Sequence, residues 1–497
     1  MTGLVGDVVL TGRPRTPAAV DPEAYVVVPA AGADLAAYRR LRHDAFVAEQ
    51  GLFATTDADD VDEDPRTRVL VARSPDGDVL GGVRVHPAHH PAVAPGHDPG
   101  WWRGSRLVVA PDARVGLGVG ASLVRAACAE AESAGALRFD ATVQAQNEVL
   151  FRRLGWQVRG RTHLHGHPHV EVDWPLARVQ RLVASTKAAL GGLLDGLVTS
   201  PAGFLGDDAS PVPGSDLVAA CDAILPAMVE RDPEWAGWCA VLVNVNDLCA
   251  MGATPVGLLD AVAGRDASFT RRILRGLGEA SRAWGVPVLG GHTQTGVPAA
   301  LSVTALGRAA APVPGAGGRP GHAVRVTADL GGAWRPGYTG AQWDSSSHRT
   351  SAELQALAGV VPALAPAAAK DVSMAGLVGT VGMLAEASGC RAVLDVADVP
   401  APADAAAGDW LTCFPGFAVV TTDAPSRTPG EALPGFLTSA ACGALEAGAG
   451  VGLRWPDGVV TEAVAAGVTG LGPAGRTTPD RRPDRRPDRH PHREDHR

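Results

Sequence analysis

Lysine is nearly absent from this sequence of 497 residues: Lys187 and Lys370 are the only two among 44 basic side chains. A lysine that persists inside a motif against such a bias indicates a requirement for that side chain. The seven cysteines are widely spaced and form no Cys-x-x-Cys pair, which argues against a zinc site or a disulfide framework. Such cysteine usage is typical of a reduced cytosol.

Long apolar runs are missing as well. No stretch of about 18 uncharged apolar residues occurs, and Asp7 interrupts the opening segment before a signal-type hydrophobic region develops. We therefore expect a cytoplasmic protein without a membrane partner. The net charge of −9 argues against nucleic acid as the main partner, because binding to a phosphate backbone needs a concentrated basic surface.

The composition is that of a folded chain with more than one domain. Hydrophobic residues make up 46% and charged residues 20%, and single cores rarely grow beyond about 250–300 residues. Short β-type runs alternate with helical patterns, which predicts α/β and α+β architecture. The expected segments are a flexible N-terminus (1–22), a first α/β domain (23–176), an amphipathic linker helix (177–200), two halves of a second region (201–312 and 322–472) divided by the Pro/Gly/Ala-rich stretch 309–321, and a disordered tail (473–497).

A glycine-rich turn in the first domain suggests a phosphate-binding loop. Segment 106–120 (RLVVAPDARVGLGVG) runs from a strand through this turn into a helix, where backbone N–H groups and the helix dipole favour a pyrophosphate. The strand RFDATV and the helix 147–156 (NEVLFRRLGW) follow. This order resembles the GNAT N-acetyltransferase family, and 38–53 (YRRLRHDAFVAEQGLF) is similar to the first helix of a GNAT branch with autoinducer-synthase-like members.

The resemblance implies a GNAT fold that binds acetyl-CoA or another acyl-CoA. Phe151 stands where the family usually has the tyrosine that protonates the departing CoA thiolate, and phenylalanine cannot donate a proton. The chain has only three tyrosines, so a substitute is hard to find. Carried over position by position, the cofactor-binding residues become Leu107, Val108, Val109, Arg114, Gly116, Gly118, Gly120 and Asn147.

Histidines alternate in RTHLHGHPHVEV, at positions 163, 165, 167 and 169. Spacing of two predicts that all four share one face of a strand, which a metal could use. No carboxylate or cysteine completes a ligand set, so a polar strand face near the substrate cleft is the favoured interpretation. We expect a second group, at 86, 89 and 90, to lie in a loop beside the acceptor site.

Four motifs follow one another in the second region: GDDAS (206–210), NVNDLCAMGA (244–253), GGHT (290–293) and KDVSMAGLVGT (370–380). Carboxylates on separate loops could hold hard cations that bridge nucleotide phosphates. The set resembles the AIR synthase-like superfamily, which includes aminoimidazole ribonucleotide synthetase, thiamine monophosphate kinase and selenophosphate synthetase. The resemblance implies two α/β halves of the PurM-like type, a homodimer formed through the first half, and Mg-ATP bound between the halves.

Roles are carried over in the same way. The ammonium of Lys370 becomes the best candidate to neutralise a phosphate or an oxyanion, and His292 becomes a catalytic or substrate contact. The resemblance further implies nucleotide contacts at Asn246, Gly290, Gly291, Ser373 and Gly376. It implies Mg²⁺ and phosphate ligands at Asp207, Asp208, Asp222, Asp247 and Asp371.

The whole chain is similar to bacterial fusions of a GNAT domain with an AIR synthase-like domain that are associated with nitrogen starvation. We therefore expect a bifunctional enzyme that joins acyl-CoA-dependent N-acyl transfer to Mg-ATP-dependent phosphoryl transfer on a small nitrogen-containing metabolite. Two alternatives stay open. The GNAT half could be a non-catalytic acyl-CoA sensor of the ATP-binding half, or both sites could bind ligand without turnover.

Overall fold

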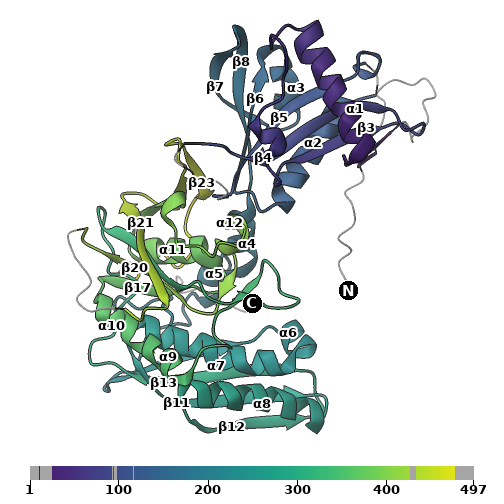
Figure 1. Ribbon diagram of the computed structural model, residues 1–497. Helices are drawn as coiled ribbons and strands as arrows, with labels where there is room; N and C mark the ends of the chain where they lie inside the picture. Colours follow the sequence, from purple (N-terminus) through teal and green to yellow (C-terminus); the bar gives the residue numbers. More distant parts are fainter. Residues whose placement is uncertain are drawn as a thin grey trace, which may run out of the picture.

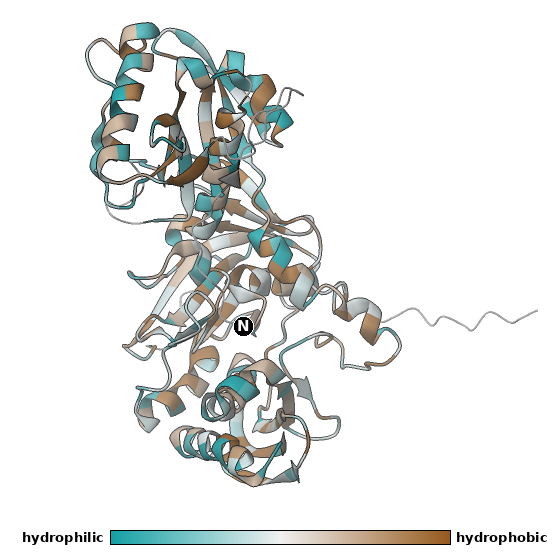
Figure 2. Cartoon of the chain, turned by 90° about the vertical axis from the view of Figure 1, so that its right-hand side faces the viewer, coloured by the Kyte–Doolittle hydropathy of each residue, from teal (hydrophilic) through white to brown (hydrophobic). Residues whose placement is uncertain are grey.

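The computed structural model describes residues 10–11, 25–91, 93, 98–115, 117–425 and 433–475. Three units follow one another along the chain, each built around a large β-sheet, and the third unit lies between the other two (Figure 1). Figure 2 shows the molecule from the side. Its outer helices carry both hydrophilic (teal) and hydrophobic (brown) stretches, as helices that bury one face do. Most of the two termini that we expected to be flexible lies outside the described residues, but Leu10–Thr11 forms strand β1, which pairs with β2.

The N-terminal unit is an eight-stranded sheet in the order β1-β2-β3-β4-β5-β6-β8-β7. Helix α2 (Val119–Ser133) buries Leu123, Ala127 and Ala131 against it. The remaining helices are α1 (Gly32–His43), which runs into a π-helical turn (Asp44–Glu49), and α3 (Glu148–Arg153). The strands are β2 (Val26–Pro29), β3 (Arg68–Arg73), β4 (Val79–Pro87), β5 (Trp101–Val109), β6 (Arg138–Gln144), β7 (Gln157–Leu164) and β8 (His167–Trp174).

Strands β5 and β6 separate part of the way along. Their parallel pairing covers Trp101 to Gly104 on β5 and ends at Ala141 on β6, although both strands continue. Arg106 follows with φ of 54°, an uncommon backbone conformation for a residue with a side chain. The opened strands leave backbone groups of β5 facing a gap instead of a neighbouring strand.

The segment 177–200 forms two helices instead of the one linker helix that we expected. Helix α4 (Arg178–Thr186) buries Val179 and Val183 in the core of the third unit, and α5 (Leu190–Leu194) follows it. The Gly191 N–H donates to the carbonyl of Thr469, so this segment is docked against the third unit along its length.

The second unit is a five-stranded sheet, β12-β11-β13-β10-β9, with two long helices on one face. Helices α7 (Pro233–Ala250) and α8 (Ala267–Trp284) pack against each other, and α7 is buried along nearly all its length. The short helix α6 (Pro226–Arg231) precedes them. The strands are β9 (Ser210–Pro211), β10 (Leu217–Ala223), β11 (Thr254–Gly264), β12 (Val288–Thr295) and β13 (Ala300–Arg308).

The third unit is a seven-stranded sheet, β17-β20-β14-β21-β18-β22-β23, with a small sheet β15-β16-β19 beside it. The apolar helix α11 (Gly376–Ala387) is buried against it; the other helices are α9 (Ser351–Ala356), α10 (Val360–Leu364) and α12 (Ala407–Trp410). The strands are β14 (Ala323–Asp329), β15 (Ala333–Trp334), β16 (Gln342–Asp344), β17 (Ala368–Asp371), β18 (Arg391–Asp395), β19 (Phe414–Pro415), β20 (Ala418–Asp423), β21 (Leu437–Glu446), β22 (Val451–Arg454) and β23 (Val460–Val464).

The N-terminal and third units share a buried interface. Trp101 and Leu137 belong to the same apolar cluster as Trp410 of α12. Arg138 is 2% exposed, lies 4.1 Å from the ring centroid of Trp101, and pairs with Asp457 at 2.8 Å. Among the described residues, no helix combines the length and apolar character that a membrane crossing requires.

Candidate active sites

The gap between β5 and β6 is the mouth of a groove in the N-terminal unit. Its walls come from the end of β5, the first turn of α2 and the start of α3. Gly118 caps α2 with φ of 69°, and no side chain caps that helix end. Among the expected cofactor residues, those that line the groove are Leu107, Val108, Val109, Arg114, Gly118, Gly120 and Asn147; Gly116 lies outside the described residues.

Arg114 crosses the entrance of this groove. Its guanidinium makes two hydrogen bonds to the carboxylate of Glu49, at 2.7 and 2.6 Å. Glu49 and its neighbour Gln50 also line the groove, and sequence reasoning missed both. Glu49 ends the π-helical turn after α1 and Gln50 caps it, so the segment that resembled an autoinducer-synthase-like branch supplies one wall.

A second, apolar cavity opens from the inner end of the groove. Phe151 lines it, is 4% exposed and packs edge-on against Trp156 with ring centroids 5.3 Å apart. Neither Tyr25 nor Tyr38 reaches this cavity. The Tyr25 hydroxyl bonds to Ser122 and Leu117, and the Tyr38 hydroxyl donates to the carbonyl of Arg106.

The four alternating histidines do not share one strand, so that prediction is wrong. A turn at His165 and Gly166, both with positive φ, divides the segment into a β7–β8 hairpin. His165 and His169 line the apolar cavity, while His167 lines the groove. The reason is Gly166, because glycine adopts the positive φ of a tight turn without steric cost.

The loop expected around 86–90 also differs. His86 lies inside β4, where its Nδ1 donates to the carbonyl of Pro87. Burial lowers the pKa of His86 to about 3, and the charge of Arg84 acts in the same direction. The ring is therefore neutral at ordinary pH, and only His89 and His90 follow the strand.

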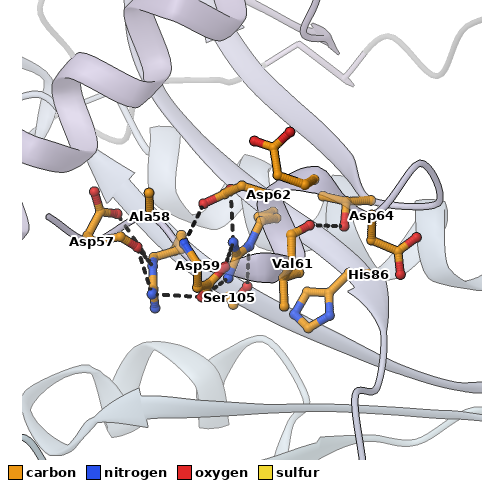
Figure 3. A network of polar contacts seen from close by, with 12 residues as sticks. Asp57, Ala58, Asp59, Val61, Asp62, Asp64, His86 and Ser105 are labelled. Carbon is orange, nitrogen blue, oxygen red and sulfur yellow. Dashed lines mark hydrogen bonds and ion pairs between the residues drawn. The ribbon is translucent and has the colours of Figure 1, made fainter. Parts of the chain in front are cut away.

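A buried network of arginines and aspartates joins α1 and β4 to the 57–64 loop (Figure 3). Arg42 of α1 and Arg84 of β4, each 1% exposed, bind carboxylates of the 57–64 loop. Arg106 donates to Asp59 and to the backbone carbonyl of Asp57. Buried charges of this number are tolerated only when they are paired. The network therefore holds the 57–64 loop against Arg106 of β5.

A second site lies where the second and third units meet. Lys370 on β17 is 1% exposed, and its ammonium donates to Asp207 at 3.0 Å, to Asp208 at 2.8 Å and to the carbonyl of Gly206 at 3.2 Å. An ammonium has three N–H donors, so all three are used. We expected the ammonium of Lys370 to be free to bind a phosphate. It instead holds two acids of the GDDAS loop in place.

Three carboxylates gather beside this lysine. Oxygen atoms of Asp208, Asp247 and Asp371 all lie within 4.8 Å of one another. The backbone N–H of Asp371 donates to Asp208 at 2.9 Å, which fixes the loop to β17. Asp247 comes from the buried end of α7, so three separate elements converge here.

The carboxylates are destabilised by their surroundings. Burial raises the pKa of Asp208, Asp247 and Asp371, and the charges of neighbouring carboxylates raise it further. Burial alone would lower the pKa of Lys370, but the charges of Asp207 and Asp208 outweigh it and raise that pKa. Four acids around one lysine leave an excess of negative charge.

Three buried oxygen atoms without hydrogen-bond partners belong to Asp371 and to close sequence neighbours of the cluster residues. They are Oδ1 of Asp371, Oδ1 of Asn246 and Oγ of Ser373. The Asn246 amide donates to the carbonyl of Gly416, which orients its oxygen. Gly376 begins α11 with φ of 70°, and a Cβ there would meet Thr412 Cα at 2.6 Å. Unsatisfied buried oxygens are rare, and a hard cation is the ligand that such a set fits.

The remaining expected residues lie in the sheet of the second unit. Asp222 on β10 acts electrostatically on both Asp247 and Asp371. Gly290, Gly291 and His292 are exposed on edge strand β12. Among the described residues, no hydrogen bond or ion pair joins His292 to the carboxylate cluster.

Two residues of this region escaped sequence reasoning. The Gly315 N–H donates to Asp207 at 2.7 Å, and a Cβ at Gly315 would meet Lys370 Cε at 2.9 Å. The stretch 309–321 therefore completes the site as well as dividing the halves. Asp260 on β11 carries a carboxyl group whose pKa is raised by burial, and a Cβ at Gly291 would lie 2.2 Å from its Oδ1.

Comparison with protein families agrees with this division. The Acetyltransferase (GNAT) family model matches residues 35–156. The AIR synthase related protein N-terminal domain matches 206–309, and the C-terminal domain of the same family matches 320–425. The chain is thus a fusion of domains from two enzyme families, one of acyltransferases and one of ATP-using enzymes, and the expected fold class is confirmed.

The relatives support the second assignment. An uncharacterized protein of Synechocystis sp. is 35% identical over 229 residues, which are 44% of this chain and 70% of that protein. The second and third units carry the two AIR synthase related domains that the family models match. An uncharacterized protein of Methanocaldococcus jannaschii is 30% identical over 38% of this chain and 60% of its own length. The thiamine-monophosphate kinase of Synechococcus elongatus is 36% identical over 22% of this chain and 36% of its own.

Solved structures with similar folds include the thiamine monophosphate kinase of Aquifex aeolicus, at 20% identity and a TM-score of 0.40, covering 55% of this chain and 95% of that one. PurL of T. maritima complexed with ADP has 16% identity and a TM-score of 0.47, covering 68% of this chain and 56% of that one.

Proposed function

We propose that the N-terminal unit transfers an acyl group from acyl-CoA to a nitrogen of a small metabolite. The groove between β5 and β6 carries this proposal, because it offers backbone groups of β5 and the uncapped end of α2 to a pyrophosphate. The acceptor nitrogen attacks the thioester carbon, a C–N bond forms and the C–S bond breaks. The thiolate takes its proton from water, since Phe151 has none to give.

His169 is our candidate for the base. Its Nδ1 lies 2.9 Å from the carbonyl of His167, and a carbonyl can only accept. Nδ1 therefore carries the proton, and the neutral ring keeps its lone pair on Nε2 in a side chain that lines the cavity. This nitrogen accepts the proton that the attacking amine loses.

The test is release of CoA by the intact protein with acyl-CoA and a panel of small amines. We expect His169→Asn to lower kcat by about 10²-fold, while His163→Asn, at an exposed site outside the cavity, behaves like the unaltered chain. An unchanged kcat in His169→Asn would remove His169 from the mechanism.

For the other two units we infer Mg-dependent ATP binding and phosphoryl transfer. The donor set of carboxylate, amide and hydroxyl oxygens suits Mg²⁺, with Asp208, Asp247 and Asp371 as ligands and Lys370 positioning Asp208. A bound Mg²⁺ would neutralise phosphate charge there. Asn246, Ser373 and the β12 residues Gly290 and His292 remain proposed contacts of nucleotide or acceptor.

Calorimetry of the intact chain with Mg²⁺ and a non-hydrolysable ATP analogue tests this inference. Asp247→Asn and Asp371→Asn should each weaken Mg-dependent binding at least tenfold. Asp216→Asn changes an exposed acid of the same unit and should leave binding as it is. Equal binding by all three variants would refute the assigned metal ligands.

A regulatory alternative has its own support. Phe151 lacks the proton of an efficient acyltransferase, and the interface through Trp101, Arg138 and Asp457 ties the acyl-CoA groove rigidly to the third unit. As a sensor, the N-terminal unit would change the ATP-dependent rate when acyl-CoA binds. Such a change without any CoA release would favour the sensor, and Phe151→Tyr would then add no acyl transfer.

We also propose a homodimer formed through the second unit. Strand β11 exposes Leu259 (41%) and the edge strand β12 exposes Leu289 (58%), so an apolar patch lies at this edge of the sheet. Such patches mark interfaces. Leu289→Asp should convert a dimer to a monomer in sedimentation velocity, and Val460→Asp, on β23 of the third unit, should not.

A further inference from the structure

The apolar cavity of the N-terminal unit extends into the hydrophobic core. It lies between α2 and the strands β4 to β6, and together with its solvent-open part it encloses about 930 Å³ of empty space. Core residues make its walls and no ion pair spans its interior. The lining residues that also belong to the main core cluster are Val83, Val124, Ala127, Phe139, Ala141, Phe151 and Trp156.

This cavity is continuous with the acyl-CoA groove. Phe46, Leu52, Leu107, Gln144 and Asn147 line both. A CoA thioester lying in the groove therefore has its sulfur end at this junction, and whatever is joined to the sulfur enters the cavity. Gln144 and Asn147 bring polar side chains to this junction, and Phe46, Leu52 and Leu107 make the rest of it apolar.

The charge pattern excludes a charged acyl group. Apart from His165 and His169, Arg106 is the one basic or acidic side chain of the described lining, and its guanidinium is already bound to Asp59 and to the carbonyl of Asp57. It also stacks on Phe53 at 4.7 Å. A carboxylate carried into the interior would find no unpaired cation, and its burial would be costly.

Phe151 has a role in this arrangement. Where a tyrosine would place a hydroxyl against the cavity, its ring and that of Trp156 leave an uninterrupted apolar wall. Phenylalanine at position 151 therefore removes a proton donor and, at the same time, adds apolar surface to the cavity wall. An uncharged chain longer than acetyl is the group that uses such a wall.

We propose that the cavity binds the hydrocarbon chain of a medium-chain acyl thioester, of the hexanoyl to decanoyl class. This rests on the proposed acyl-CoA binding and deepens it by naming the acyl group. Each methylene placed in an apolar site strengthens binding about fourfold, so chain length selects the substrate where no polar contact can.

Calorimetry of the intact chain with CoA, acetyl-CoA, butyryl-CoA, hexanoyl-CoA and octanoyl-CoA tests the proposal. We expect affinity to rise along the series, with octanoyl-CoA at least tenfold tighter than acetyl-CoA. A flat series, or one in which acetyl-CoA binds best, overturns the chain-length proposal and leaves acyl-CoA binding in place. Absence of binding by CoA and by every thioester would overturn the acyltransferase itself.

Two filling variants locate the chain. Ala127→Leu on α2 and Ala141→Leu on β6 each place a larger side chain in the cavity, and should lower the octanoyl-to-acetyl affinity ratio at least tenfold. Ala126→Leu is the matched control, since Ala126 is equally buried on α2 but does not line the cavity. The ratio should stay unchanged there. A fall of the ratio in the control, or none in the filling variants, contradicts the proposed site, and melting curves identify any variant that fails to fold.

Discussion

Lys370 makes its three hydrogen bonds to a single loop, which carries Asp208 of the carboxylate cluster and its neighbour Asp207. Asp208 is held by the lysine through one oxygen and by the Asp371 N–H through the other. A compact ammonium can serve three converging acceptors, whereas a planar guanidinium directs its donors outward in a fork. The lysine therefore acts through the carboxylates that it positions.

We predict that Lys370→Arg lowers the affinity for Mg-ATP at least tenfold, because the longer group displaces Asp208. Lys370→Met should also cost about 3–5 kcal/mol of folding stability, since it leaves buried carboxylates uncompensated. Calorimetry and urea unfolding measure the two effects. Arg265→Lys changes an exposed basic side chain of the second unit, paired with Glu230, and should alter neither quantity.

His86 should make the N-terminal unit sensitive to acid. Its pKa is about 3 in the folded chain and 6.5 when free, so the unfolded state binds the proton first and stability falls as pH drops below 6.5. Arg84, Arg103 and His89 all oppose a charge on this ring. At 1.36 kcal/mol per pH unit, the loss by pH 5 is about 2 kcal/mol. His86→Gln should lose less between pH 7 and 5 in urea unfolding, and His163→Gln should match the unaltered chain.

Individual residues differ in how far the sequence predicted their place. The motif at 370–380 predicted that Lys370 and Asp371 belong to the second site. Phe151 was recognised because the tyrosine hydroxyl expected at that position is missing. Gly315 was not, because a glycine that holds a carboxylate looks like any glycine of a turn until Asp207, more than a hundred positions earlier, is brought to it. The paired positions of His165 and His169 depended on one turn that strand periodicity does not register.

At the scale of elements, the linker also shows that local sequence does not predict contacts between distant segments. Amphipathic spacing over 177–200 indicates a helix, and α4 buries the face that the spacing indicates. The break before α5 follows from docking: the Gly191 N–H bonds to Thr469, and a Cβ on Gly191 would meet the carbonyl of Gly470 at 2.3 Å. Contacts between distant segments decide such breaks, so local pattern alone predicted the strands and helices better than their ends.

Edge strand β12 offers a test of close packing. Gly291 pairs with Asp260, and a Cβ at Gly291 would meet both the side-chain Oδ1 and the backbone oxygen of Asp260 within 2.4 Å. We predict that Gly291→Ala destabilises the second unit by about 1–3 kcal/mol, measured by thermal unfolding. Gly359→Ala, where a Cβ meets nothing within 4 Å, is the control and should be neutral or slightly stabilising. A neutral Gly291→Ala would show that β11 and β12 can separate.

For the molecule as a whole, the sequence predicted the order of the two enzyme domains but not the buried interface between them. Trp101 and Leu137 belong to the N-terminal unit, yet they are buried in one apolar cluster with Trp410 of α12. Gly408 approaches the backbone of Gly135 so closely that a Cβ would lie 1.8 Å from its carbonyl oxygen. The backbones of the two units are therefore in direct contact at this interface.

Arg138 should therefore couple the unfolding of the two units. Its guanidinium lies over Trp101, 5.9 Å from the ring centroid of Trp455, and pairs with Asp457 across the interface. We predict that Arg138→Ala splits a single calorimetric transition into two, because the buried contact that joins the units is lost. A double-mutant cycle with Asp457→Ala should give a coupling energy of about 0.5–3 kcal/mol.

The matched control is Arg181→Ala, which removes an exposed ion pair between α4 and Glu132 of α2. Exposed pairs contribute about 0–1 kcal/mol, so this variant should keep the single transition. If Arg138→Ala also keeps it, apolar contacts alone hold the units together. If the unaltered chain already melts in two steps, the acyl-CoA groove and the carboxylate cluster belong to bodies that move separately, and the sensor alternative loses its structural support.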